Sequence, residues 1–220
     1  MRLIVFDCDG TLVDSQKGIM RGIETAWSEF GLEIPKLSSV LQIIGLSLED
    51  AVAVLEPNLD KETQNKLVET YINVFKNSGG VKDEEEILFD DVKETLQTLN
   101  TENTVMAVLT GKSRGGLMAT YEKQNIGDFF VISKTADCGP GKPNPHTLNE
   151  IITETGVDIN RVVMIGDTTH DILTAKNGNI KSIGVSFGYH SVDELNSAGA
   201  DIIVDKFNEL PNAIAKLIGE

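Results

Sequence analysis

The chain has 220 residues, with 34 acidic and 19 basic side chains and a formal net charge of −15. A chain of this length can bury a sizeable core, as one domain or as a core with a small companion. The negative charge argues against binding along nucleic-acid phosphates or an anionic membrane, because both require clustered lysine and arginine. An enclosed acidic pocket that holds a cation remains compatible with this composition.

The sequence has no stretch that approaches the roughly 20 apolar residues needed to cross a bilayer, and its first residues lack the pattern of a signal peptide. We therefore expect a cytoplasmic protein, and we expect it to be a monomer or a weak homodimer. Cys8 and Cys138 are too few and too isolated for a disulfide framework or a zinc site. We interpret both as reduced, structural residues.

The first apolar run, Leu3 to Phe6, has the character of a strand and ends in two aspartates, Asp7 and Asp9. Gly10 and Thr11 follow at once. For an isolated pair of this kind, a turn or a helix cap explains the acids as well as a functional site does. The meaning of the pair therefore depends on what lies at the ends of the other strands.

The next part of the chain, residues 15–80, has helical patterns only. We interpret it as an all-helical insert of four helices or a similar number, on the spacing of three apolar groups: Ile19, Ile23, Trp27 and Phe30, then Ala51 to Leu55, then Leu67, Tyr71 and Phe75. The stretch NSGGVKDEEEILFDD, glycine-rich and then acidic, is typical of a connector. Its glycines suit a hinge.

Beyond the insert, short apolar runs alternate with helical patterns. The runs cover residues 104–109, 129–132, 162–165, 182–185 and 202–204, and their shortness favours strands buried on both faces. The alternation predicts an α/β core, a Rossmann-like doubly wound parallel sheet formed by residues 1–14 and 81–220. Within LFDDV, Asp90 or Asp91 is expected to cap the helix that follows.

Polar residues recur at the ends of these runs. Thr110 follows the second strand-like run, and Lys142 lies in the loop GPGKPNP just before a helical pattern. Asp167 follows the run at 162–165, and Asp171 comes one helical turn later. Because ligands bind beyond the carboxyl ends of the strands in such sheets, these residues fall where this fold class has its active site.

The chemistry of these side chains points to phosphoryl transfer. Crowded carboxylates repel one another unless some are protonated or a cation joins them, and an all-oxygen site that shares a phosphate favours Mg²⁺. A threonine and a lysine facing the same point complement an anion with several oxygens. In a site acting on a small phosphorylated metabolite, Asp7 can be the nucleophile and Asp9 the general acid and base.

Four motifs in order carry a resemblance to a known family: DCDGT, Thr110, Lys142 and GDTTHD. They resemble the motifs of the haloacid dehalogenase (HAD) superfamily, in its phosphoglycolate phosphatase-like branch with a helical cap, and the resemblance covers nearly the whole chain. It implies a mobile cap at residues 15–80, obligatory Mg²⁺ and hydrolysis of a small phosphate monoester such as 2-phosphoglycolate. The reaction would pass through an aspartyl-phosphate.

The resemblance also implies roles for particular residues. The metal ligands would be Asp7, Asp9 through its backbone carbonyl, Asp167 and Asp171. In such enzymes the residue at the Asp171 position more often supports the metal indirectly than by direct coordination. Phosphate would be bound by Thr110, Gly111 and Lys142. Apart from the resemblance, we expect IIGLSLED, near the middle of the insert, to face the catalytic residues and contribute to substrate choice. The expected substrate contacts are Gly45, Leu46 and Leu48, together with Lys112 and Arg114.

Two other functions stay open on the sequence. A phosphosugar mutase of the same superfamily often carries a cap arginine in a GxxR pattern, where this chain has Leu48. A non-enzymatic phospho-acceptor, such as a response-regulator receiver domain, also combines acids, a threonine and a lysine on a parallel sheet. Receivers are roughly half this length and lack the inserted helices.

Overall fold

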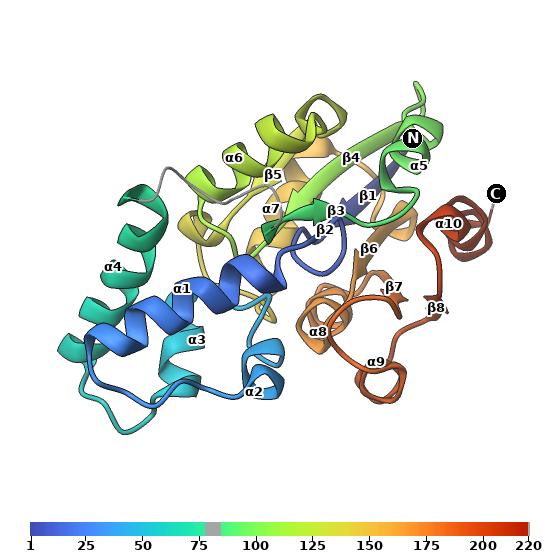
Figure 1. Cartoon of the computed structure of the whole chain (residues 1–220). Helices are drawn as coiled ribbons and strands as arrows, with labels where there is room; N and C mark the ends of the chain where they lie inside the picture. The colour runs from blue at the N-terminus through green and yellow to red at the C-terminus, as the bar shows by residue number, and fades with distance from the viewer. Residues whose placement is uncertain (78–84, 220) are drawn as a thin grey trace.

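The computed structural model of the chain describes residues 1–77 and 85–219. Its main sheet has six parallel strands in the order β5-β4-β1-β6-β7-β8 (Figure 1). This arrangement confirms the predicted α/β class. The strands are β1 (Arg2–Phe6), β4 (Thr104–Leu109), β5 (Ile132–Lys134), β6 (Val162–Gly166), β7 (Lys181–Val185) and β8 (Ile202–Val204).

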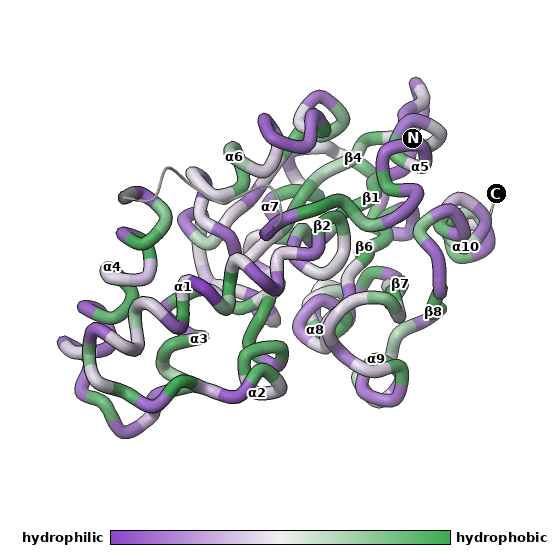
Figure 2. The backbone as a smooth tube through the Cα atoms, viewed as in Figure 1, coloured by the Kyte–Doolittle hydropathy of each residue, from purple (hydrophilic) through white to green (hydrophobic). Residues whose placement is uncertain are grey.

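Helices cover both faces of the sheet because successive side chains of a strand point in opposite directions. In β1, Ile4 and Phe6 belong to the core shared with α5 (Val92–Leu99), α6 (Arg114–Gln124) and α10 (Leu210–Ile218). Leu3 and Val5 belong to the core shared with α7 (His146–Thr155) and α8 (Thr169–Asn177). The helix α9 (Val192–Ala198) packs against α8. Figure 2 shows the hydrophobic residues along these central strands.

Four helices between the first strand and the rest of the sheet form the cap. They are α1 (Gln16–Glu29), α2 (Leu37–Leu41), α3 (Leu48–Leu55) and α4 (Lys61–Asn77). The cap has its own hydrophobic core around Trp27, which is buried and donates a hydrogen bond of 2.7 Å from Nε1 to Glu56 Oε1. Figure 1 shows these helices gathered on one side of the molecule, away from both termini.

The two connections between cap and core run side by side. Val13 and Asp14 form β2 (Val13–Asp14), which pairs antiparallel with β3 (Ile87–Leu88). The register opposes Val13 to Leu88 and Asp14 to Ile87. The glycines expected to act as a hinge, at positions 79 and 80, lie outside the described residues.

Two local predictions were wrong. The run at 129–132 begins as a short 3₁₀ helix, Gly127–Phe129, and β5 starts only at Ile132, because Phe130 stacks on Tyr121 with ring centroids 5.4 Å apart. Asp91 stands before α5 but its side chain makes no capping hydrogen bond. Its backbone has φ of 62°, and its Oδ2 accepts a 2.7 Å hydrogen bond from Asn208 instead.

None of the helices in residues 1–77 and 85–219 is both long and apolar enough to span a membrane.

Candidate active site

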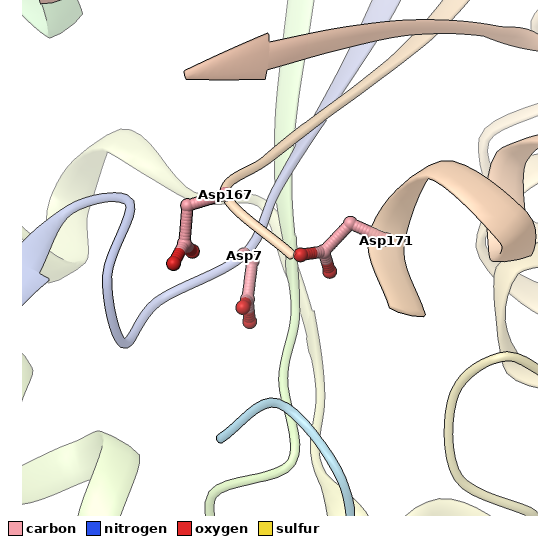
Figure 3. Close-up of side chains that lie close together, drawn as sticks. All are labelled: Asp7, Asp167 and Asp171. Atoms are coloured by element: carbon pink, nitrogen blue, oxygen red, sulfur yellow. The ribbon is translucent and has the colours of Figure 1, made fainter. Parts of the chain in front are cut away.

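Three buried aspartates meet at the carboxyl end of the sheet. Asp7 follows β1, Asp167 follows β6, and Asp171 lies in the first turn of α8. Because β1 and β6 are adjacent and parallel, their ends lie side by side. Carboxylate oxygens of the three residues all lie within 4.8 Å of one another, and Figure 3 shows the side chains turned toward one space. We call these residues the carboxylate cluster.

Asp167 is held by two donors that the strand ends bring to it. Thr11 Oγ1 donates a 2.8 Å hydrogen bond to Oδ1, and the backbone N–H of Tyr189 donates one of 2.9 Å to Oδ2. Gly10 makes the close approach possible, because a Cβ there would lie 2.1 Å from Asp167 Oδ2. Its φ of 84° also favours glycine.

Asp171 is fixed by the start of its own helix and by a lysine. Its Oδ2 accepts hydrogen bonds from the backbone N–H of Thr168 at 3.0 Å and from Thr168 Oγ1 at 2.7 Å. Its Oδ1 accepts a 2.6 Å hydrogen bond from Lys142 Nζ. Both carboxylate oxygens of Asp171 are therefore already engaged by the protein.

Lys142 links two members of the carboxylate cluster. Its ammonium lies 2.9 Å from Asp7 Oδ1 and 2.6 Å from Asp171 Oδ1, and the residue is buried. Burial alone would lower the pKa of Lys142, but the charges of Asp171 and Asp7 outweigh it and raise the pKa above its usual 10.5. The lysine is therefore a fixed positive charge beside Asp7.

Asp7 is the least satisfied member of the carboxylate cluster. Oδ1 faces the Lys142 ammonium, and Oδ2 accepts no hydrogen bond from the described residues, although both oxygens are buried. Burial raises the pKa of Asp7 from 3.8 to about 7, with Asp171 and Asp9 adding to the shift and Lys142 opposing it. Burial, together with Asp171 and Asp7, also raises the pKa of Asp167.

The charge balance and donor set of the carboxylate cluster suit a divalent cation. Three carboxylates face one ammonium, that of Lys142, which leaves two negative charges to be neutralised when all three are ionised. All available ligand atoms are carboxylate oxygens, which hard cations prefer. Asp7 Oδ2, which has no hydrogen-bond partner among the described residues, fits the same conclusion, since a bound cation would satisfy it.

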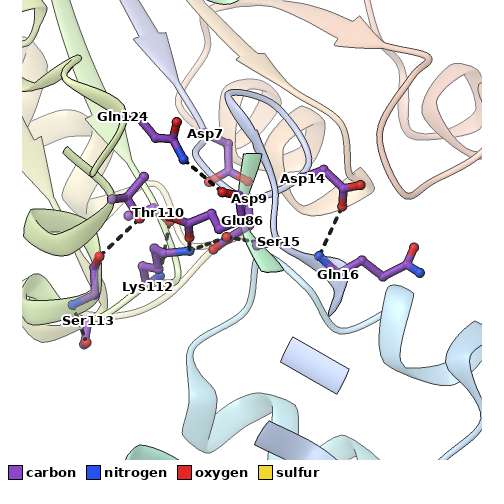
Figure 4. Close-up of polar contacts among 12 residues, drawn as sticks. Asp7, Asp9, Asp14, Ser15, Gln16, Glu86, Thr110, Lys112, Ser113 and Gln124 are labelled. Atoms are coloured by element: carbon purple, nitrogen blue, oxygen red, sulfur yellow. Dashed lines mark hydrogen bonds and ion pairs between the residues drawn. The ribbon is translucent and has the colours of Figure 1, made fainter. Parts of the chain in front are cut away.

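Asp9 points away from the carboxylate cluster. Its Oδ1 accepts a hydrogen bond of 2.5 Å from Ser15 Oγ and forms a close ion pair with Lys112. Lys112 Nζ also lies 3.0 Å from Glu86 Oε2 (Figure 4). Burial would lower the pKa of Lys112, but Asp9 and Glu86, together with the nearby Cys8, raise it well above the usual value.

Thr110 and Gly111 follow β4 beside Lys142. Thr110 Oγ1 accepts a 3.1 Å hydrogen bond from the backbone N–H of Lys112. A Cβ at Gly111 would lie 2.1 Å from the backbone carbonyl oxygen of Leu46 in the cap. A small cavity here is lined by residues of both cap and core, among them Ser47, Thr110 and Lys142.

The cap segment expected to contact substrate reaches the core through its backbone. A Cβ at Gly45, where φ is 97°, would lie 3.3 Å from Thr168 Oγ1 and 3.6 Å from Lys142 Nζ. The side chains of Leu46 and Leu48 instead pack against the hydrophobic core of the cap. Arg114 is exposed at the start of α6, where its backbone N–H donates to Asp137, so the described contacts do not bring it to the other site residues.

Sequence reasoning assigned no role to Thr11, Ser15, Glu86 or Tyr189. Thr11 and Tyr189 hold Asp167, while Ser15 and Glu86 contact Asp9 and its partner Lys112. Thr11 could have been found from its place directly after the paired aspartates. Glu86 had no such signal, because it lies in an acidic run typical of a solvated connector and is nevertheless 2% exposed.

The fold and the carboxylate cluster together define a class of hydrolases. The chain belongs to the haloacid dehalogenase-like hydrolases, whose family profile matches residues 4–185. The superfamily inferred from the sequence motifs is thereby confirmed, and the protein is an enzyme of this hydrolase family.

Named relatives are phosphatases. The chain is 32% identical over 218 residues to "Probable phosphatase IndB" of Dickeya dadantii, covering 98% of this chain and 94% of that protein. It is 30% identical to "Phosphoglycolate phosphatase" of Caulobacter vibrioides, covering 98% and 91%. A solved structure described as a predicted phosphatase from Clostridium acetobutylicum is 26% identical, has a TM-score of 0.86 and covers 98% of each chain.

Proposed function

We propose that this enzyme is a Mg²⁺-dependent phosphatase that hydrolyses a small phosphate monoester, with 2-phosphoglycolate as the first candidate, through a phosphorylated Asp7. One observation carries the proposal. Asp7 is a buried carboxylate whose Oδ1 lies 2.9 Å from the Lys142 ammonium and whose Oδ2 has no hydrogen-bond partner among the described residues, and two further acids stand beside it. A carboxylate in this setting is suited to attack rather than to a structural role.

Asp7 and Asp167 would bind the Mg²⁺ directly, with Asp171 beside them. Bound Mg²⁺ would neutralise the carboxylate cluster and polarise the oxygens of the phosphoryl group. Lys142 would hold a phosphoryl oxygen by charge. Thr110 accepts its hydrogen bond from Lys112, which leaves its own O–H to donate to the phosphoryl group.

The reaction has two steps, transfer of the phosphoryl group to Asp7 and hydrolysis of the phosphorylated Asp7. In the first, a carboxylate oxygen of Asp7 attacks phosphorus, the bond to the ester oxygen breaks with its electron pair, and Asp9 gives a proton to the departing oxygen. In the second, water attacks phosphorus and Asp9 takes its proton. The bond from phosphorus to Asp7 then breaks, which releases inorganic phosphate and restores Asp7.

The other two functions receive less support. In a mutase, the position of Leu48 would carry a cap arginine, whereas Leu48 packs in the core of the cap. A receiver domain needs no acid two residues beyond its acceptor, whereas here Asp9 stands two residues after Asp7 and its side chain is fixed by Ser15 and Lys112.

A panel of phosphate monoesters tests the proposed function. We expect release of inorganic phosphate from 2-phosphoglycolate and other small esters with Mg²⁺, and none in chelator until Mg²⁺ is restored. Ca²⁺ should inhibit, because its larger and looser coordination misplaces the phosphoryl group. Full activity in the presence of chelator would contradict the metal-dependent mechanism, and activity on no ester would contradict the function itself.

A further inference from the structure

The ammonium of Lys112 joins two carboxylates of different origin. One belongs to Asp9 in the loop after β1, and the other to Glu86 in the segment that leads into β3, 3.0 Å away. The side chains of Lys112 and Glu86 are 15% and 3% exposed, so the pair is largely sheltered from water. Figure 4 shows Lys112 with its contacts to Asp9 and Glu86.

The backbone of Glu86 is anchored independently of this ion pair. Gln124 Nε2 donates a 2.9 Å hydrogen bond to the Glu86 carbonyl oxygen, and Ile87 is already paired in the β2–β3 ribbon. The carboxylate of Glu86 can therefore leave Lys112 by a side-chain movement, without release of the segment that carries it.

The inference rests on the proposed function, which places the substrate close to Lys112. If Asp9 gives its proton to the ester oxygen, that oxygen lies within hydrogen-bond reach of Asp9. Lys112 contacts the same carboxylate. A charged group on the carbon next to the ester oxygen then falls within reach of Lys112 Nζ.

We infer that the Lys112 ammonium binds a carboxylate on the leaving group, and that the Glu86 carboxylate takes this place in the absence of substrate. A substrate carboxylate and Glu86 compete for one ammonium. Glu86 is thus a specificity-determining residue that weakens binding of carboxylated esters such as 2-phosphoglycolate. Because the pair is sheltered, the competition is screened less than one at the surface.

A neighbouring ion pair provides an internal comparison. Glu85 Oε1 lies 2.6 Å from Arg21 Nε, on a helix of the cap, and the Arg21 guanidinium stacks over the ring of Phe75 at 4.9 Å. Two adjacent acids therefore pair with two different cations. Lys112, the cation paired with Glu86, contacts Asp9, whereas Glu85 pairs with a cation on α1, so Glu85 should not share the effect on specificity.

Three two-carbon phosphate esters that differ mainly in terminal charge test the inference. They are 2-phosphoglycolate, 2-hydroxyethyl phosphate and 2-aminoethyl phosphate. In Glu86→Gln we expect the ratio of kcat/KM for 2-phosphoglycolate to that for 2-hydroxyethyl phosphate to rise about tenfold, because the competing charge at contact distance is removed. The ratio of kcat/KM for 2-aminoethyl phosphate to that for 2-hydroxyethyl phosphate should fall.

Lys112→Met and the matched Glu85→Gln variant complete the experiment. Lys112→Met should lower the preference for 2-phosphoglycolate and cancel the effect of Glu86→Gln in the double variant, whereas Glu85→Gln should leave the ratio unchanged. An unchanged or lower ratio in Glu86→Gln, or an equal rise in Glu85→Gln, would overturn the inference. If the wild-type enzyme hydrolyses none of the three esters, the proposed function fails and the inference fails with it.

Discussion

Asp7 is buried beside two other carboxylates and a single ammonium, so replacing it tests chemistry and charge balance together. We expect Asp7→Asn to lower turnover of phosphate esters by more than about 10³, because an amide does not attack phosphorus. In chelator its melting temperature should equal or exceed that of the wild type, since repulsion in the carboxylate cluster is relieved. Phosphate release and thermal unfolding measure the two effects.

Asp193→Asn is the matched control for this prediction, because Asp193 is exposed on α9 and is not a member of the carboxylate cluster. It should leave both turnover and melting temperature near the wild-type values. An Asp7→Asn enzyme that retained a tenth of the wild-type rate would rule out Asp7 as the nucleophile.

Asp9 is the second residue whose role can be isolated. Asp9→Asn removes the proton donor and base but keeps the nucleophile, which should cost roughly 10² to 10⁴ in turnover of an alkyl ester. With p-nitrophenyl phosphate, whose leaving group needs little protonation, we expect a rapid burst of p-nitrophenol followed by slow turnover. The burst should approach one equivalent of enzyme. Unchanged steady-state turnover of the alkyl ester would contradict the acid and base role.

The sequence predicts which polar residues lie at the carboxyl edge of the sheet where regular strands place them. Asp7, Thr110 and Asp167 each follow a strand of one parallel sheet, so their proximity is a consequence of strand order. Glu86 and Tyr189 reach the site through loop paths and cap packing, which no periodicity records. The direction of the Asp9 side chain, toward Lys112 rather than the carboxylate cluster, likewise depends on tertiary contacts.

Among the secondary-structure elements, the loop after β4 and the cap segment before α3 meet at Gly111. A Cβ at this position would lie 2.1 Å from the Leu46 carbonyl oxygen, and backbone on both sides leaves little room to adjust. Gly111→Ala should therefore push the cap away from the core. We expect lower activity and faster hydrogen exchange in residues 45–50, measured by mass spectrometry.

The matched control is Gly115→Ala, four residues further along the same segment. A Cβ at Gly115 meets nothing within 4 Å, and alanine favours the helix α6 in which it lies. This variant should keep wild-type activity and exchange rates. Equal loss in both variants would mean that the Gly111 contact does not position the cap.

Element boundaries were predictable where burial sets them and less so where side chains compete. The apolar runs at 104–109 and 202–204 match β4 and β8 residue for residue, because alternate side chains enter two cores. The run containing Phe129 and Phe130 is equally apolar, but stacking of Phe130 on Tyr121 delays the strand. Asp91 differs from the prediction because its backbone is left-handed, with φ of 62°, and its side chain makes no capping hydrogen bond.

At the scale of the whole molecule, a chain with a net charge of −15 should gain stability from any cation, so a specific metal effect must be separated from screening. We expect Mg²⁺ to raise the melting temperature above the value reached in NaCl of the same ionic strength. At 100 times the Kd, binding to the folded state contributes about 2.7 kcal/mol. Differential scanning calorimetry over a Mg²⁺ series measures this.

Asp167→Asn separates the two contributions. It removes one carboxylate from the carboxylate cluster while the other acidic residues of the chain remain. In this variant, Mg²⁺ should therefore raise the melting temperature no more than NaCl of the same ionic strength does. An undiminished specific Mg²⁺ shift in this variant would place the metal elsewhere in the molecule.

The β2–β3 ribbon has a consequence for how such a molecule can be rebuilt. Since Asp14 opposes Ile87, the chain leaves the core and returns to it at neighbouring points. At the ribbon itself, the core therefore requires only that the two ends of the inserted segment lie side by side. A tight turn joining the two strands would close the ribbon as a simple hairpin, and a foreign module with adjacent termini could replace the helices. The ribbon is therefore an attachment point at which one hydrolytic core could carry different inserted segments.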